Sequence, residues 1–123
     1  MQDNKYIRSG YRVDYSLAEC TWSMVERHNE VANIWSHLVG VPVFVALVVW
    51  VLSGRAELAS EAWLEQAPFL VFVCGCGAAY TASVVFHPFL CHSHAALIMC
   101  SRLDYSGIVL IIMTSIMPGV YYG

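Results

Sequence analysis

Three long apolar stretches, separated by short polar segments, constrain this chain more than any other feature of its sequence. They cover residues 33–53, 67–87 and 103–123, each close to the ~20 residues that a helix needs to cross about 30 Å of hydrocarbon. Helices satisfy their backbone hydrogen bonds locally, as a bilayer requires. With 59% hydrophobic and only 12% charged residues, the chain has too few charges to cover a water-facing surface. The sequence therefore predicts an all-α membrane protein with three transmembrane helices.

Positive charges gather ahead of the first span. Lys5, Arg8, Arg12 and Arg27 precede it, whereas the two connections contain only Arg55 and Arg102. Since Lys and Arg favour the cytoplasmic side, we expect a cytoplasmic segment at 1–32, an extracellular or lumenal loop at 54–66 and a cytoplasmic loop at 88–102. The chain is then an integral, multi-pass protein of the plasma membrane or an endomembrane. No basic run points to nucleic acid as a partner.

The segment before the first span predicts a helix along the membrane interface. Ser23 and Glu26 have the spacing of a capping box, which predicts a helix start at Ser23. Glu30, Asn33 and His37 then follow at i, i+3 and i+7, on one polar face. An amphipathic interface helix and a functional polar face explain this pattern about equally well.

A second polar stripe runs along the second span. Cys76, Tyr80, Ser83 and His87 recur at i, i+4, i+7 and i+11, so they share one helix face. Ionisable groups at membrane depth are costly unless they are paired or hydrated, and they often mark ligand, metal or proton sites. His87 is therefore the leading candidate for a functional residue. The alternative is that His87, at the end of the span, simply lies in the interface.

Asp104 strengthens the functional interpretation of His87. It opens the predicted third span, and the connection returns the chain to the same membrane face, so we expect His87 and Asp104 at one depth. Imidazole and carboxylate are ordinary zinc ligands, and a carboxylate can also hold a metal-bound water. Ser83 could orient that water or a substrate carbonyl, or bond its own i−4 carbonyl. His92 and His94 form no recognisable metal spacing, and we expect both to be solvated.

The cysteines do not predict a disulfide framework. There are five of them, and Cys74 and Cys76 lie inside the second span, where we expect them to pack as small side chains. Cys91 and Cys100 bracket the second connection, on the side predicted to be reducing. We therefore expect no disulfide between those two.

Several motifs together resemble the progestin and adipoQ receptor family, which includes the adiponectin receptors and is related to haemolysin III. The resemblance rests on residues 6–12, 28–30, 33–37, 83–87, 91–93, 103–108 and 118–122. It implies a seven-span helical bundle, of which this chain matches the first three spans. It further implies a buried zinc near the cytoplasmic side, with His87 as a ligand, Asp104 as the acid that contacts the zinc-bound water, and Ser83 beside them. The family's other ligands form a His-x-x-x-His pair on its last span, which this sequence lacks.

The resemblance implies a receptor-like membrane protein whose zinc, in a complete chain, would support hydrolysis of a lipid amide such as ceramide, together with signalling. The expected partners are the lipid bilayer, a lipid or protein-hormone ligand, and other helices, which the small residues of the second span would admit. The abrupt end of the chain suggests a fragment that lacks part of the zinc site. The alternative is accordingly a truncated, non-enzymatic membrane fragment or helix-packing protein without zinc.

Overall fold

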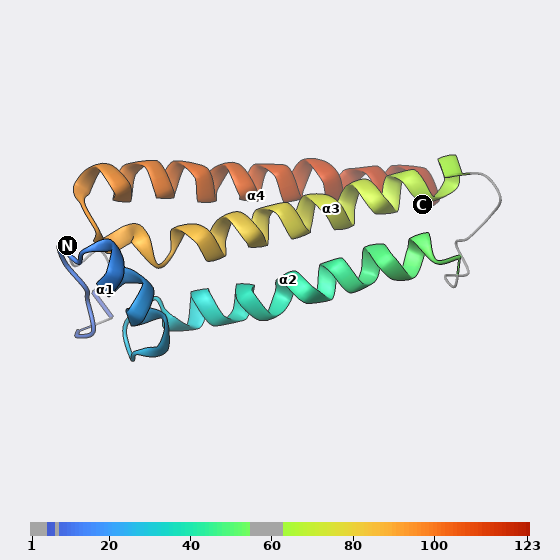
Figure 1. Ribbon diagram of the computed structural model, residues 1–123. Coiled ribbons are helices and arrows are strands. Elements are labelled where there is room, and N and C mark those ends of the chain that lie inside the picture. The colour runs from blue at the N-terminus through green and yellow to red at the C-terminus, as the bar shows by residue number, and fades with distance from the viewer. Residues whose placement is uncertain (1–4, 7, 55–62) are drawn as a thin grey trace.

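The chain folds into three long helices joined by short connections (Figure 1). A computed structural model describes residues 5–6, 8–54 and 63–123. Along the chain it contains α1 (Leu17–Trp22), η1 (Ser23–Val25), α2 (Val31–Leu52), α3 (Trp63–Phe86), η2 (Phe89–Cys91) and α4 (His94–Tyr122). No strand occurs within the described ranges. The prediction of an all-α architecture is therefore confirmed.

The three long helices are each long and apolar enough to cross a membrane. They contain 22, 24 and 29 residues, which at 1.5 Å per residue exceed the ~30 Å of a hydrocarbon core. Their outward surfaces are apolar: Val39 is 60% exposed and Met113 is 64% exposed. Such surfaces suit lipid rather than water. The prediction of three candidate membrane spans is confirmed.

Helix α3 lies between α2 and α4 and packs against both (Figure 1). Within the described part of the chain, α2 and α4 do not pack on each other. Glycines permit the close approach to α3. A Cβ placed on Gly75 would lie 2.6 Å from Oγ1 of Thr114, and one placed on Gly40 would lie 2.5 Å from the ring of Tyr80. Small residues are common where membrane helices approach closely.

The N-terminal segment folds over one end of the bundle, and its first helix differs from the prediction. The capping box that forms is Ser16 with Glu19, at the start of α1. Ser23 instead lies buried in η1, where its hydroxyl donates to the carbonyl of Cys20 and accepts from Arg12. The prediction of an α-helix capped by Ser23 and Glu26 is therefore wrong: only the three-residue η1 begins at Ser23, whose hydroxyl is bonded to the carbonyl of Cys20 and to Arg12.

The connection between α3 and α4 is shorter than the sequence predicts. Ser93 caps α4 by accepting from the amide of Ala96, so the helix begins at His94. Asp104 therefore lies within α4 and does not open it. Of the predicted outside loop at 54–66, residues 55–62 lie outside the described residues. The cytoplasmic and outside assignments stay predictions.

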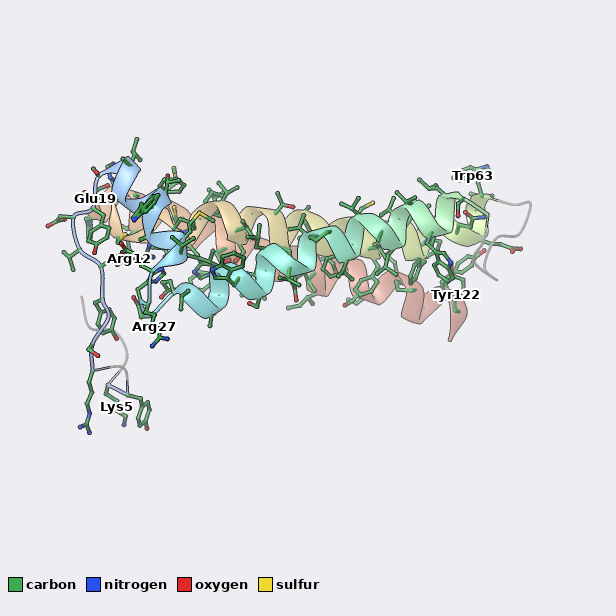
Figure 2. All side chains as sticks on the ribbon, turned by 60° about the horizontal axis from the view of Figure 1, so that its bottom comes forward. Lys5, Arg12, Glu19, Arg27, Trp63 and Tyr122 are labelled. Carbon is green, nitrogen blue, oxygen red and sulfur yellow. The ribbon has the colours of Figure 1, made fainter. Side chains whose placement is uncertain are left out.

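The two ends of the bundle differ in composition. Figure 2 shows Arg12 and Glu19 at the end covered by α1, and Trp63 with Tyr122 at the opposite end. There the hydroxyl of Tyr122 donates to the backbone carbonyl of Glu65, which ties the last turn of α4 to the first turn of α3. Glu30, His87 and Asp104, which can bind metals or transfer protons, lie near the α1 end.

Candidate functional site

His87 follows directly after α3, and both nitrogens of its ring face carboxylates. Its amide donates to the carbonyl of Ser83 at 3.0 Å, which continues the helical pattern and fixes where the ring projects. Nδ1 lies 2.8 Å from Oε2 of Glu30. A carboxylate accepts, so Nδ1 carries the proton and Nε2 of the neutral ring keeps its lone pair. Nε2 faces Oδ2 of Asp104 at 3.9 Å.

Glu30 is the centre of a polar cluster at the start of α2. As the N-cap residue of that helix, it accepts from His87, from Nδ2 of Asn33 at 2.9 Å and from Nδ2 of Asn29 at 2.7 Å. The hydrogen bond from His87 lowers the pKa of Glu30 most, and the amide of Asn33 and the charge of Arg12 lower it further, against the opposing effect of burial. Glu30 is therefore ionised and able to orient the imidazole.

A cavity of about 230 Å³ opens beside these groups. It is lined by residues of all three long helices and their ends: Glu30, Asn33, Phe86, His87, Leu90, Cys100, Ser101, Asp104 and Tyr105. His87 and Asp104, brought together by the α3–α4 packing, line the same cavity. Glu30 joins them from α2. The depth of His87 and Asp104 in a bilayer stays a prediction.

Ser83 lies one turn before His87 and is buried. Its hydroxyl is 2.7 Å from Nδ1 of His37, on α2, rather than bonded to its own i−4 carbonyl. The ring of His37 is 5.9 Å from that of His87 and 4.7 Å from that of Tyr80, centroid to centroid. The polar stripe predicted along the second span therefore faces the bundle interior and meets the polar face of the first.

Arg12 fixes the same end of α3 from the N-terminal segment. Its side chain is only 8% exposed. One terminal nitrogen donates to the carbonyl of His87 at 3.1 Å, and the other donates to the carbonyl of Pro88 at 3.2 Å and to the hydroxyl of Ser23. Carbonyls at a helix C-terminus carry partial negative charge and lack intrahelical donors, so a guanidinium suits them. Arg12 thereby holds the backbone of His87, while Glu30 holds its ring.

Arg12 and Glu30 are not among the site residues predicted from the sequence. Nothing in the local pattern of Arg12 indicates burial, so the sequence gives it only as a topological charge. The spacing of Glu30, Asn33 and His37 on one polar face is the available signal for the cluster. His92, predicted to be solvated, instead donates from Nδ1 to the carbonyl of Tyr15 at 2.8 Å.

The polar cluster around His87 brings one imidazole and two carboxylates together. Among residues 5–6, 8–54 and 63–123, no group of three or more His, Cys, Asp or Glu side chains is arranged to hold a metal ion. His87 and Asp104 form a pair, and Glu30 is already bonded to His87 through Nδ1. The arrangement can orient one imidazole and offer one further carboxylate beside it.

Three candidate membrane spans with a polar cluster at one end define a multi-pass helical membrane protein. Residues 25–123 match the family model described as haemolysin-III related. The chain therefore belongs to the haemolysin-III-related family, and the resemblance to the progestin and adipoQ receptors is confirmed.

The similar proteins include a heptahelical membrane protein from a plant and receptors from animals. The chain is 36% identical to heptahelical transmembrane protein 1 of Arabidopsis thaliana, over 99% of this chain and 38% of that protein. It is 36% identical to progestin and adipoQ receptor-like protein 1 of Caenorhabditis elegans and 34% identical to the adiponectin receptor protein of Drosophila melanogaster. Each match covers 100% of this chain and 28% of the relative. The chain thus spans 28% to 38% of these relatives.

Proposed function

We propose that this chain forms the part of a receptor-like seven-span membrane protein that contributes His87 and Asp104 to a buried zinc site. In the longer protein this site would support hydrolysis of a lipid amide such as ceramide, coupled to signalling. The observation that carries the proposal is the orientation of His87, whose Nδ1 is bonded to Glu30 while Nε2 faces Asp104. Histidines that bind metals commonly donate their second nitrogen to a carboxylate in this way.

The residues present fit one side of a zinc site. Two ligands of one tetrahedral zinc, each at about 2.0–2.2 Å, lie roughly 3.3 Å apart. The 3.9 Å between Nε2 of His87 and Oδ2 of Asp104 is close to that separation. A catalytic zinc takes three protein ligands, so at least one more has to come from elsewhere. In the relatives that role would belong to the segments this chain does not match.

Zinc in this position would act as a Lewis acid on an amide carbonyl and make a water molecule acidic enough to attack it near neutral pH. In the alternative arrangement, where Asp104 contacts the zinc-bound water and not the ion itself, it would accept the proton of the attacking water and pass it to the leaving amine. Glu30 would keep His87 in the tautomer that presents Nε2. Ser83 is buried one turn before His87 and does not line the cavity. Its hydroxyl, already bonded to His37, could donate to a substrate oxygen once that bond is exchanged.

The competing proposal is a receptor or scaffold in which no hydrolysis occurs, or a helix-packing fragment without zinc. It is supported by the donor count, because the sequence contains no His-x-x-x-His pair. A lipid or protein-hormone ligand would then act through helix packing. In either case we propose that the α1 end faces the cytoplasm, as the Lys and Arg distribution predicts.

The first test is the zinc content of this chain, purified in detergent and dialysed against a weak chelator. We expect far less than one zinc per chain, because one histidine and one carboxylate do not replace three protein ligands. Stoichiometric zinc that is lost in His87→Ala would refute this expectation. His94→Ala serves as the control, since His94 is exposed and lies outside the cavity that contains His87.

The second test joins this chain to the remaining part of a relative. In a chimaera, the portion of the Arabidopsis relative beyond the matched segment follows Gly123. We expect one zinc per chain, retained in His94→Ala and lost in His87→Ala. In Glu30→Gln the affinity for zinc should fall about 10- to 100-fold. Release of fatty acid from a ceramide by the zinc-loaded chimaera, abolished in Asp104→Asn, would support the hydrolase. Zinc binding without such release would support the receptor or scaffold instead.

A further inference from the structure

Two cysteine thiols from distant parts of the chain face each other at the α1 end. Cys20 belongs to α1 and Cys91 ends η2, yet their sulfur atoms lie 3.6 Å apart across 71 positions of sequence. Cys20 is completely buried, whereas Cys91 is half-buried. A disulfide has an S–S bond of about 2.05 Å, so the two sulfur atoms would need to approach by roughly 1.5 Å.

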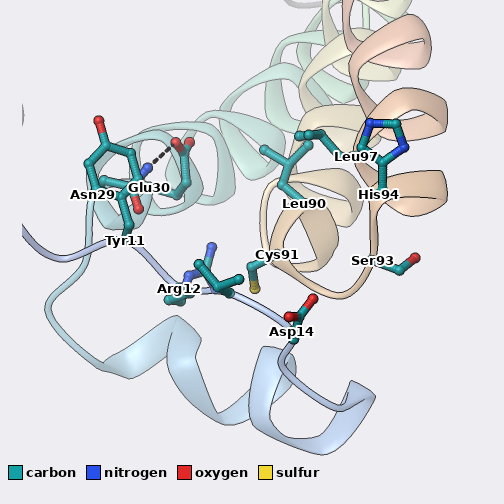
Figure 3. A pocket seen from close by; sticks show the side chains of 11 residues that line it. Tyr11, Arg12, Asp14, Asn29, Glu30, Leu90, Cys91, Ser93, His94 and Leu97 are labelled. Atoms are coloured by element: carbon teal, nitrogen blue, oxygen red, sulfur yellow. Dashed lines mark hydrogen bonds between the residues drawn. The ribbon is translucent and has the colours of Figure 1, made fainter. Parts of the chain in front are cut away.

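The backbone holds the two thiols in this position. The amide of Tyr15 donates to the carbonyl of Cys91 at 3.2 Å, and the carbonyl of Tyr15 accepts from Nδ1 of His92 at 2.8 Å. The N-terminal segment is therefore hydrogen-bonded, through the amide and the carbonyl of Tyr15, to the junction that carries Cys91. Figure 3 shows Cys91 projecting from this junction toward the segment that carries Arg12 and Asp14. The contact between the thiols is part of a docked interface.

We propose that Cys20 and Cys91 form a reversible disulfide that fastens the N-terminal segment to the junction between α3 and α4. The oxidant is a small disulfide such as glutathione disulfide. This inference does not depend on zinc or on hydrolase activity. It concerns a pair that the sequence did not suggest, since Cys20 and Cys91 lie in separate segments.

The reaction has two exchange steps. The Cys91 thiolate attacks glutathione disulfide, so a mixed disulfide forms and one glutathione leaves as a thiolate. Cys20 loses its proton and attacks the sulfur of Cys91, which forms the protein disulfide and expels the second glutathione. Two electrons pass from the protein thiols to glutathione disulfide, and the two protons released are taken up by the departing glutathione thiolates.

The environment of each thiol sets the order of these steps. Burial, followed by the hydrogen bond with Cys91, raises the pKa of Cys20 to about 11, so Cys20 is protonated near neutral pH. Only the thiolate attacks, and Cys91 is the more accessible of the two. Cys91 therefore reacts first and Cys20 resolves the mixed disulfide slowly. In a reducing cytosol, where we expect this end to lie, such a bond forms only transiently, under oxidising conditions.

The bond would act on the end of α3 that carries His87. Arg12 belongs to the same docked segment and donates to the carbonyls of His87 and Pro88. Fastening the segment through Cys91 would keep Arg12 on these carbonyls, whereas reduction would leave the segment held by hydrogen bonds alone. The redox state of the pair thus controls how often this end of α3 is uncovered.

The test exposes the purified 123-residue chain, in detergent, to glutathione disulfide and maps the disulfides by mass spectrometry without reduction. We expect a linked Cys20–Cys91 peptide that disappears in Cys20→Ser and in Cys91→Ser. It should persist in Cys74→Ser, where the altered thiol is exposed on α3. Helical circular dichroism establishes that each variant is folded. Mapping of the unaltered chain is decisive alone: glutathione retained on Cys91 with Cys20 still reduced, or Cys91 bonded to another cysteine, would overturn the proposal.

A second measurement follows the docked segment itself. Trypsin cleaves after Arg12 only when that buried side chain leaves its site, whereas Arg8 is exposed. Oxidation should slow cleavage after Arg12 by more than about tenfold and leave cleavage after Arg8 unchanged. Equal cleavage rates at Arg12 in the oxidised and reduced chains would show that the disulfide does not fasten the segment.

Discussion

Replacing Arg12 by Gln tests whether the N-terminal segment is held on the bundle by a buried guanidinium. Arg12 donates to the carbonyls of His87 and Pro88 and to the hydroxyl of Ser23. A hydrogen bond that involves a charged group contributes about 1.5–3 kcal/mol, and the cost of burying the cation offsets part of the sum. We expect the free energy of opening of the segment to fall by about 3 kcal/mol. Lys should restore only part of it, because one ammonium cannot reproduce the forked geometry.

Labelling of Cys20 by a water-soluble maleimide reports this opening, because Cys20 is completely buried in the closed state. A loss of about 3 kcal/mol corresponds to labelling roughly 100-fold faster, quantified on the Cys20 peptide. The positive charge of Arg12 also lowers the pKa of Cys20. Removal of this charge would by itself slow the reaction of the Cys20 thiol with maleimide. Faster labelling therefore has to come from opening of the segment.

Arg27→Gln is the matched control, since Arg27 belongs to the same segment and is exposed. We expect it to leave the labelling rate of Cys20 within about twofold of the unaltered chain, as is usual for surface substitutions. The reasoning would be refuted if Arg12→Gln labelled at the rate of the unaltered chain, or if Arg27→Gln accelerated labelling equally.

Two further predictions concern helix packing and pH. Gly75→Ala should destabilise the α3–α4 contact by about 1–3 kcal/mol, because the added Cβ would lie 2.6 Å from Thr114. Gly119→Ala should not destabilise the protein, because the space around Gly119 is open. Unfolding in SDS-containing micelles, followed by tryptophan fluorescence, compares the two variants. His28 donates from Nε2 to the carbonyl of Ser23 and accepts at Nδ1 from the amide of Glu30, so the folded state needs the neutral ring. Burial, then the charge of Arg12, lowers the pKa of His28 below its ordinary 6.5. The stabilising contribution of His28 is therefore complete above about pH 6.5 and is lost as the pH falls through its lower pKa in the folded state. The melting temperature should be lower at about pH 5 than at about pH 7.5, and an unchanged melting temperature would contradict the assignment.

The sequence predicted the elements whose signal is local. Apolar runs long enough to cross a bilayer identified α2, α3 and α4, since the length of a span is set by the hydrocarbon thickness. Helical periodicity placed Ser83 and His87 on one inward face. Their proximity to Asp104 followed from a single assumption, that the connection returns the chain to the same membrane face.

The remaining features depend on contacts that leave no periodic trace. The contact between Arg12 and the carbonyl of His87 joins residues 75 positions apart, and a buried Arg cannot be distinguished from an exposed one by its neighbours in sequence. The start at Ser23 failed for a related reason. Ser16–Glu19 and Ser23–Glu26 have the same capping spacing, and they differ in that the hydroxyl of Ser23 accepts from the distant Arg12.

The packing of the N-terminal segment on the far end of α3 imposes an order on synthesis. Arg12 leaves the ribosome 75 residues before the carbonyl that it binds, which at 5–20 residues per second is a delay of about 4–15 s. During that time Arg12 and Cys20 are exposed, and the interface that buries them does not exist. The segment made first is therefore among the last to reach its final position.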